Sequence, residues 1–137
     1  MGINRNAKIY IAGHTGMVGS AIARDLQKDK HSVTVADIDE GVQDLLSPFG
    51  IDYVKFDFSD LNTIAESVKN YDLVVGAVPG FMGYEILKTV LTSRKNIVDI
   101  SFMHEDSRKL YSIAENNGVT AITDAGIAPG LSNLLFG

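Results

Sequence analysis

The feature that most constrains this chain is its opening pattern, in which an apolar run, evenly spaced glycines and a helical pattern follow one another directly. The apolar run spans residues 8–12, and glycines stand at positions 13, 16 and 19. Apolar residues at helical spacing then continue from Val18 to Leu26. This order predicts a buried strand, a tight turn and a helix over about residues 17–29.

The glycines give this turn the properties of a corner that binds an anion. Gly13 can adopt the backbone angles that reverse the chain after a strand, and Gly16 allows a ligand's diphosphate to approach the main chain. Gly19 allows the helix to pack closely on the strand. The helix also directs its unpaired N–H groups and the positive end of its dipole at this corner. We therefore expect a dinucleotide here, and the residues expected to contact it are Gly13, His14, Thr15, Gly16, Met17 and Val18.

An acidic residue, Asp37, ends the second predicted strand, which spans residues 32–37. At this point of a dinucleotide-binding unit a carboxylate can bond both hydroxyls of the adenosine ribose, and Ile38 follows it at the same edge. The carboxylate would repel the phosphate that NADP carries on this ribose, and no arginine stands next to Asp37. The expected cofactor is therefore NAD rather than NADP. The alternative is that Asp37 is an ordinary residue at a strand end.

Strand and helix patterns alternate along the rest of the chain. Further strands are predicted over residues 52–57, 72–78, 96–100 and 119–123, and further helices over residues 42–46, 61–68, 82–92 and 105–117. Such alternation requires a parallel sheet with right-handed crossovers and helices on both faces. We therefore expect an α/β fold, a Rossmann-type doubly wound sheet of about six strands, which forms a single dinucleotide-binding domain over residues 1–137.

Ligands of such sheets bind outside the carboxyl ends of the strands. The residues that follow the predicted strands should therefore converge on one crevice beside the glycine turn. We expect adenine near Asp57 and Phe58, and nicotinamide near Pro79 and Gly80. The cofactor-binding candidates after the glycine turn are Asp37, Ile38, Asp57, Phe58, Ala77, Val78, Pro79, Gly80, Phe81, Ser101 and Phe102.

Composition excludes several classes of function. The formal net charge of −5 argues against nucleic acid as a partner, and the absence of cysteine excludes disulfides, thiolate metal sites and a cysteine nucleophile. The three histidines are far apart in sequence, so no metal site is predicted, and no catalytic residue is assigned. No apolar run approaches the length of about 18 residues that a membrane span needs. We expect a cytoplasmic protein without membrane contact.

Three segments resemble the NAD-binding half of the saccharopine dehydrogenase and lysine 6-dehydrogenase group. They are Val-Gly-Ala-Val-Pro-Gly-Phe at 75–81, Val-Asp-Ile-Ser-Phe at 98–102 and Asp-Ala-Gly-Ile-Ala-Pro-Gly-Leu-Ser-Asn at 124–133, and the resemblance covers about residues 30–137. It implies an amino-acid dehydrogenase that passes hydride from an amine-bearing carbon to NAD. It also implies that a further domain, expected after residue 137, holds the amino-acid substrate. The 137 residues alone are then expected to bind cofactor without turnover.

The opening residues 7–21 are also similar to GDP-fucose synthase, an extended short-chain dehydrogenase. Lysine dehydrogenases commonly carry Gly-Ala-Gly where this chain has Gly13-His14-Thr15-Gly16. Three alternatives therefore stay open: a truncated or chimeric chain, a nucleotide-sugar epimerase or reductase, and a nucleotide-binding module without a reaction. An exposed sheet edge or an uncovered face would favour a homo-oligomer.

The strongest feature for the short-chain dehydrogenase alternative is the spacing of Tyr84 and Lys88. In that family such a pair passes a proton to the substrate carbonyl. The pair there follows the fifth strand, whereas here it follows the fourth predicted strand. An amphipathic helix with Ile86, Leu87, Val90 and Leu91 directed inward is therefore the favoured interpretation.

Overall fold

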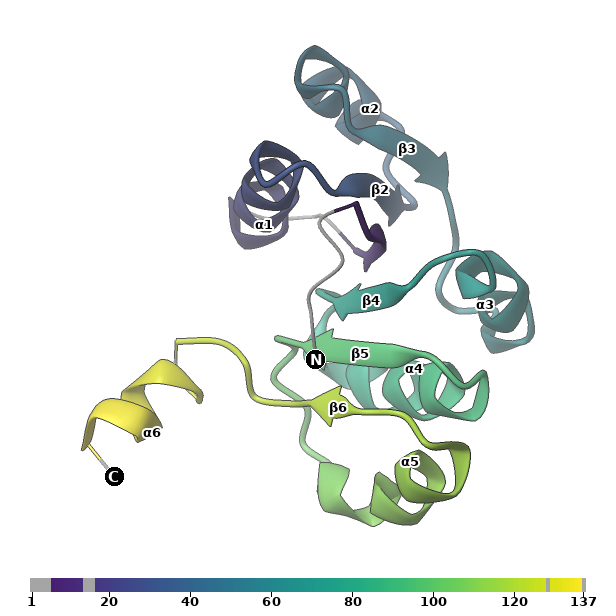
Figure 1. Ribbon diagram of the computed structural model, residues 1–137, viewed down its shortest axis with the longest axis vertical. Coiled ribbons are helices and arrows are strands. Elements are labelled where there is room, and N and C mark those ends of the chain that lie inside the picture. The colour runs from purple at the N-terminus through teal and green to yellow at the C-terminus, as the bar shows by residue number, and fades with distance from the viewer. Residues whose placement is uncertain (1–5, 14–16, 128, 137) are drawn as a thin grey trace.

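The computed structural model describes residues 6–13, 17–127 and 129–136, and over these residues strands and helices alternate (Figure 1). The strands are β1 (Lys8–Ala12), β2 (Ser32–Asp37), β3 (Asp52–Lys55), β4 (Leu73–Gly76), β5 (Asn96–Asp99) and β6 (Ala121–Ile122). The α-helices are α1 (Met17–Lys28), α2 (Gly41–Leu46), α3 (Leu61–Val68), α4 (Gly80–Thr92), α5 (Tyr111–Asn117) and α6 (Leu131–Phe136), and two 3₁₀ segments are η1 (Ser47–Phe49) and η2 (Ser107–Leu110). Across this described part, no helix is both long enough and apolar enough to cross a membrane.

The described strands form one six-stranded sheet in the order β3-β2-β1-β4-β5-β6, and every pair of neighbours is parallel. The chain runs outward from β1 to β3, returns to the centre, and then runs outward on the other side from β4 to β6. The direction of winding therefore reverses between β1 and β4. This confirms the predicted doubly wound fold, and it creates a crevice at the carboxyl ends of these two central strands.

Helices cover both faces of the sheet, so the domain has two apolar cores (Figure 1). Successive side chains of a strand point to opposite faces. Ile9 and Ile11 of β1 therefore pack in the core that contains Val42 and Leu46 of α2. The intervening Tyr10 packs in the other core, which α3, α4 and α5 cover. This burial on both faces explains why the central strands β1 and β4 are almost continuously apolar.

The ends of several helices follow the sequence predictions. The Asp60 side chain accepts a hydrogen bond from the backbone N–H of Asn62 at 3.1 Å and thereby caps α3. Gly50 and Gly118 have left-handed backbone angles, with φ of 67° and 65°, where η1 and α5 end. In α4, Ile86, Leu87, Val90 and Leu91 are all buried, which confirms that this helix packs on the sheet.

Several element boundaries differ from the predictions. The helix predicted from residue 105 begins as η2 at Ser107, because the carboxylate of Asp106 binds the backbone N–H and the guanidinium of Arg108 and caps the turn. Hydrogen bonds to Arg108 lower the pKa of Asp106 to about 2. The strand predicted over 72–78 ends at Gly76, and α4 begins at Gly80, two residues earlier than predicted. Helix α6 was not predicted, and it extends away from the sheet (Figure 1).

Candidate functional site

The turn after β1 is held between the ends of the two neighbouring strands. The Gly13 N–H donates to the carbonyl of Ala36 at 2.8 Å, and the Ala77 N–H donates to the carbonyl of Ala12 at the same distance. Gly13 has a φ of +86°, and a Cβ at this position would lie 2.8 Å from the Ala77 carbonyl oxygen. Only glycine therefore fits here, as the sequence predicts.

Of the other residues predicted to contact the diphosphate, only Met17 and Val18 lie among the described residues. His14, Thr15 and Gly16 lie outside the described residues, so their contact with a diphosphate stays a prediction. Met17 begins α1, and Val18 follows it in the first turn with 58% of its surface exposed. This helix begins directly beyond the Gly13 turn, at the carboxyl end of β1.

The carboxylate predicted to bind the ribose is rigidly held. Asp37 ends β2 with only 3% of its surface exposed. Its Oδ1 accepts a hydrogen bond from the Asp39 N–H at 3.0 Å, and its carbonyl accepts from the Phe56 N–H and the Tyr53 hydroxyl, both at 2.9 Å. Ile38, which follows, is 59% exposed. The position of Asp37 is thus set before any ligand arrives.

A cavity of about 360 Å³ lies beside Asp37, at the point where the winding of the sheet reverses. It is lined by Gly13, Asp37, Ile38, Phe56, Asp57, Phe58, Ser59, Val78, Pro79, Phe81 and Met82. The rings of Phe56 and Phe58 contact each other with centroids 4.7 Å apart. An apolar cavity with one buried carboxylate on its wall suits a flat heteroaromatic ring joined to a hydroxylated sugar.

Eight of the predicted residues meet in this cavity, namely Gly13, Asp37, Ile38, Asp57, Phe58, Val78, Pro79 and Phe81. The sequence prediction missed Phe56, Ser59 and Met82. Phe56 was assigned to the third strand, but β3 ends at Lys55 and Phe56 begins the loop. Asp57 is exposed, and hydrogen bonds from the Ser59 side chain and from the Ser59 N–H, which lies 2.9 Å from Asp57 Oδ1, lower its pKa. It therefore also shapes the loop.

Four other predicted residues, Ala77, Gly80, Ser101 and Phe102, do not line this cavity. Ala77 packs against Gly13, and Gly80 packs against the Phe102 carbonyl so closely that a Cβ would lie 1.9 Å from its oxygen. Phe102 is 64% exposed, whereas Ser101 is buried. These residues form a second group, on the β4–β5 side of the crevice. Contact between this group and nicotinamide stays a prediction.

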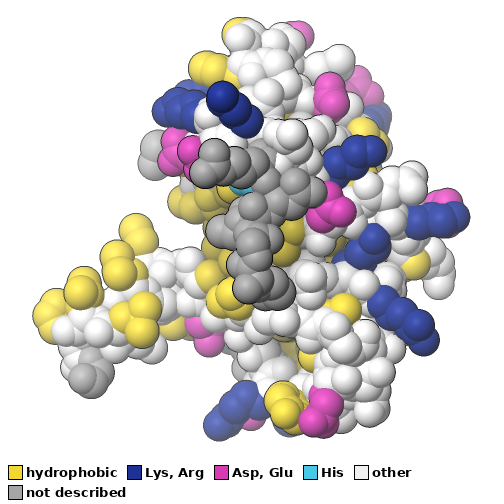
Figure 2. Space-filling view, in the orientation of Figure 1, with side chains coloured by type: hydrophobic (Ala, Val, Ile, Leu, Met, Phe, Trp, Pro, Cys, Tyr) yellow, Lys and Arg dark blue, Asp and Glu magenta, His cyan; other side chains and the backbone are white. Residues whose placement is uncertain are grey.

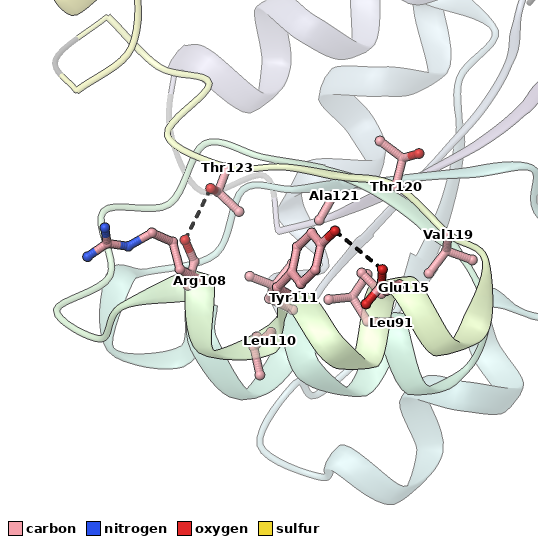
Figure 3. Close-up of a pocket in the computed structure, with 12 residues that line it drawn as sticks. Leu91, Arg108, Leu110, Tyr111, Glu115, Val119, Thr120, Ala121 and Thr123 are labelled. Atoms are coloured by element: carbon pink, nitrogen blue, oxygen red, sulfur yellow. Dashed lines mark hydrogen bonds between the residues drawn. The ribbon is translucent and has the colours of Figure 1, made fainter.

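A larger pocket of about 440 Å³ lies at the edge of the sheet, where α4, α5 and β6 meet (Figure 3). Its walls include Leu91, Leu110 and Val119, and the Ser107 and Thr123 hydroxyls lie 3.2 Å apart beside it. The charged residues on its rim, Arg108 and Glu115, are exposed. Because this pocket is remote from β1 and β2, we do not assign it to the cofactor.

Comparison with known proteins identifies the family. Residues 9–122 match the model of the saccharopine dehydrogenase NADP binding domain. The chain belongs to this family. The match confirms the resemblance that the sequence segments indicated, and it supports a nicotinamide dinucleotide as the class of cofactor for this chain.

Individual members of the saccharopine dehydrogenase group are distant but cover most of the chain. The mitochondrial alpha-aminoadipic semialdehyde synthase of Mus musculus is 24% identical over 138 residues, which are 98% of this chain and 15% of that protein. The saccharopine dehydrogenase (NADP(+), L-glutamate-forming) of Pyricularia oryzae is 24% identical over 81 residues, 59% of this chain and 18% of that protein.

A solved structure agrees with the fold. The apo saccharopine dehydrogenase (L-Glu forming) from Saccharomyces cerevisiae superimposes with a TM-score of 0.82 at 22% identity, covering 95% of this chain and 29% of that chain. The chain thus spans less than a third of each of these three relatives.

Proposed function

We propose that this chain is the NAD-binding domain of an amino-acid dehydrogenase of the saccharopine dehydrogenase and lysine 6-dehydrogenase type. In the intact enzyme, hydride would pass from the amine-bearing carbon of the substrate to the cofactor. The observation that carries this proposal is the buried, fixed carboxylate of Asp37 on the wall of an apolar cavity at the switch point of the sheet.

In this proposal, different residues bind different parts of the cofactor. Adenine occupies the cavity between Phe58 and Pro79, and Asp37 accepts hydrogen bonds from the ribose. The amides at the start of α1 hold the diphosphate. The second group, with Gly80 and Phe102, borders the nicotinamide, whose ring supplies the hydride-accepting carbon when bound. The protein contributes orientation, which brings the two reacting carbons into contact.

We further propose that NAD is preferred, although the family description names NADP. Around the end of β2, Asp37 is followed by Asp39 and Glu40, so the ribose edge carries several negative charges. Lys55 is paired with Asp37 in the sheet register, but its ammonium is bound to Glu40 at 2.5 Å. A phosphate on the ribose would meet the negative charge of the Asp37 carboxylate, and this repulsion disfavours NADP.

Calorimetric titration of the 137-residue chain with NAD and with NADP tests both proposals. We expect NAD to bind at least about tenfold more tightly, a difference of about 1.4 kcal/mol. Asp37→Ser should weaken NAD binding and reduce the preference, because it removes both the ribose acceptor and the repulsion. Asp44→Ser, on the exposed face of α2, serves as the control that should change neither. Tighter binding of NADP, or an unchanged preference in Asp37→Ser, would contradict the assignment.

We place the intact enzyme in the cytoplasm, in keeping with a chain that lacks cysteine. Its amino-acid substrate is held by a further domain in this proposal, because the cavity at the switch point is accounted for by the adenosine half of the cofactor. A dehydrogenase assay of these 137 residues with lysine and NAD should accordingly give no turnover. Turnover by this domain alone would overturn the assignment of substrate binding to a further domain.

A further inference from the structure

A fully buried acid lies behind the second group of predicted residues. Asp99 ends β5 with 0% of its surface exposed. Its Oδ1 accepts hydrogen bonds from the Ser101 N–H at 2.8 Å and from the Ser101 hydroxyl. Its Oδ2 is also buried and has no hydrogen-bond partner among the described residues. Burial of such a group is costly, so its presence calls for a specific role.

Two glycines make the space that this acid and its serine occupy. A Cβ on Gly76, at the end of β4, would lie 2.0 Å from Asp99 Oδ2. A Cβ on Gly83, in the first turns of α4, would lie 2.2 Å from Ser101 Oγ. Neither glycine has a positive φ, so the reason for glycine at both positions is close approach. The Asp99–Ser101 pair is therefore wedged between β4 and α4.

Three segments of the chain are joined at this pair. The Ile100 N–H donates to the Gly76 carbonyl at 2.9 Å, and the Ala125 N–H donates to the Asp99 carbonyl at 3.1 Å. One residue beyond Ser101, the Phe102 carbonyl abuts Gly80 at the first residue of α4. The position of the loop after β5, relative to the beginning of α4, thus depends on the hydrogen bonds that Asp99 accepts.

We propose that Asp99 is a positioning residue for the nicotinamide half of the cofactor, acting through Ser101 to hold residues 100–103 against the beginning of α4. This inference rests on the proposed function. Asp99 and Ser101 are absent from the lining of the cavity assigned to adenosine, so their influence is confined to the other half of the ligand.

The raised pKa of Asp99 shows that its ionised form is unfavourable in the folded protein. A carboxyl at this position is therefore better explained by the position that it gives the loop than by a gain in stability. Burial raises its pKa to about 6, and the nearby charge of Asp124 acts in the same direction, while the hydrogen bonds from Ser101 act against them. An apolar side chain would avoid this desolvation cost but could not accept from Ser101. The carboxyl of Asp99 is therefore best explained by the fixed position that its hydrogen bonds give to residues 100–103.

Separate titrations of the 137-residue chain with NAD and with ADP-ribose, which lacks nicotinamide, test the inference. Asp99→Ala should weaken NAD binding about tenfold and leave ADP-ribose binding within about twofold of the wild type. Asp99→Asn retains an oxygen that can accept from Ser101 and should restore NAD binding. Asp37→Ala is the matched control, and it should weaken both ligands, since both contain the adenosine ribose.

Equal weakening of NAD and ADP-ribose by Asp99→Ala would mean a merely structural role, and unchanged NAD binding would mean no role; either result overturns the inference. If Asp99→Ala does not fold, Ser101→Ala provides the same test, since it removes only the hydroxyl, and a loss confined to NAD is again expected. If the wild-type chain bound neither ligand, the proposed function itself would fail, which distinguishes that outcome from a failure of the role of Asp99.

Discussion

At the scale of single residues, two buried carboxylates lie at the carboxyl edge of the sheet in contrasting surroundings. Asp37 is on a cavity wall, with its backbone and Oδ1 fixed by neighbouring residues. Asp99 is enclosed by β4, α4 and the loop after β5, with one oxygen bonded to Ser101. In the functions proposed above, the first carboxylate binds the ligand, whereas the second positions a loop of the protein.

The titration of Asp99 should make the free energy of unfolding depend on pH. Burial raises the pKa of Asp99 from 3.8 to about 6 in the folded state, so the folded protein holds this proton more tightly than the unfolded chain. The resulting stabilisation is present below about pH 4 and is lost as the pH rises to about 6, a loss on the order of 3 kcal/mol. Asp99→Asn replaces the carboxyl by an amide that does not titrate over this pH range, so its stability lacks this pH dependence. Urea unfolding from pH 4 to 7 should therefore show wild-type stability falling relative to the variant, and a constant difference would contradict this.

Site residues could be predicted from the sequence where local chemistry determines them, and not where a tertiary contact does. Gly13 and Asp37 follow from the turn and strand pattern, and both line the cavity. Ser101 was expected in the crevice, but it turns to Asp99 because Gly83, eighteen positions earlier, leaves room for its hydroxyl. No local pattern links those two positions. Phe56 was missed because strand alternation does not reveal where a strand stops.

At the scale of elements, side-chain caps mark where α3 and η2 begin, and glycines mark where η1 and α5 end. Such features are local in sequence, which explains why the beginning of α3 and the end of α5 agree with the predicted ranges 61–68 and 105–117. The helix predicted from residue 105 begins two residues later, as η2 at Ser107, because Asp106 caps it. Helix α6 was not among the predicted helices.

The cap of α3 provides a test at this scale. Asp60→Ala leaves the Asn62 N–H without its side-chain acceptor and should lower the free energy of unfolding by about 1 kcal/mol. Asp60→Asn is the matched variant, because an asparagine oxygen can accept the same bond, and it should retain most of the stability. Chemical denaturation of the three proteins measures both effects. Equal losses in the alanine and asparagine variants would rule out capping as the contribution of Asp60.

At the scale of the whole molecule, α6 is the element least integrated into the domain (Figure 1). Its apolar side chains gather on the surface in Figure 2, and Leu134, Leu135 and Phe136 are 85%, 68% and 88% exposed. A cluster of this kind on a short helix favours contact with other apolar surface. In aqueous solution, the exposed apolar side chains of a second copy of the chain provide such a surface.

We therefore predict that the 137-residue chain self-associates as its concentration rises. Replacing Leu134 and Phe136 together by lysine should keep it monomeric, since both apolar side chains are lost and charge is added. Asn133→Lys adds a charge to the same helix without removing apolar surface and should still associate. Sedimentation velocity over a range of concentrations measures this. A wild-type chain that sediments as a monomer throughout would disprove the prediction.

The central place of β1 in the sheet also determines when the domain can become complete during synthesis. The first strand pairs with β2, which follows it soon, and with β4, which follows much later; the Lys8 N–H, for instance, donates to Asp72 Oδ2, 64 positions away. Until β4 leaves the ribosome, one edge of β1 has no partner strand and Tyr10 lacks much of its core. The nascent chain is therefore most exposed to aggregation and to chaperone capture between the emergence of β2 and that of β4.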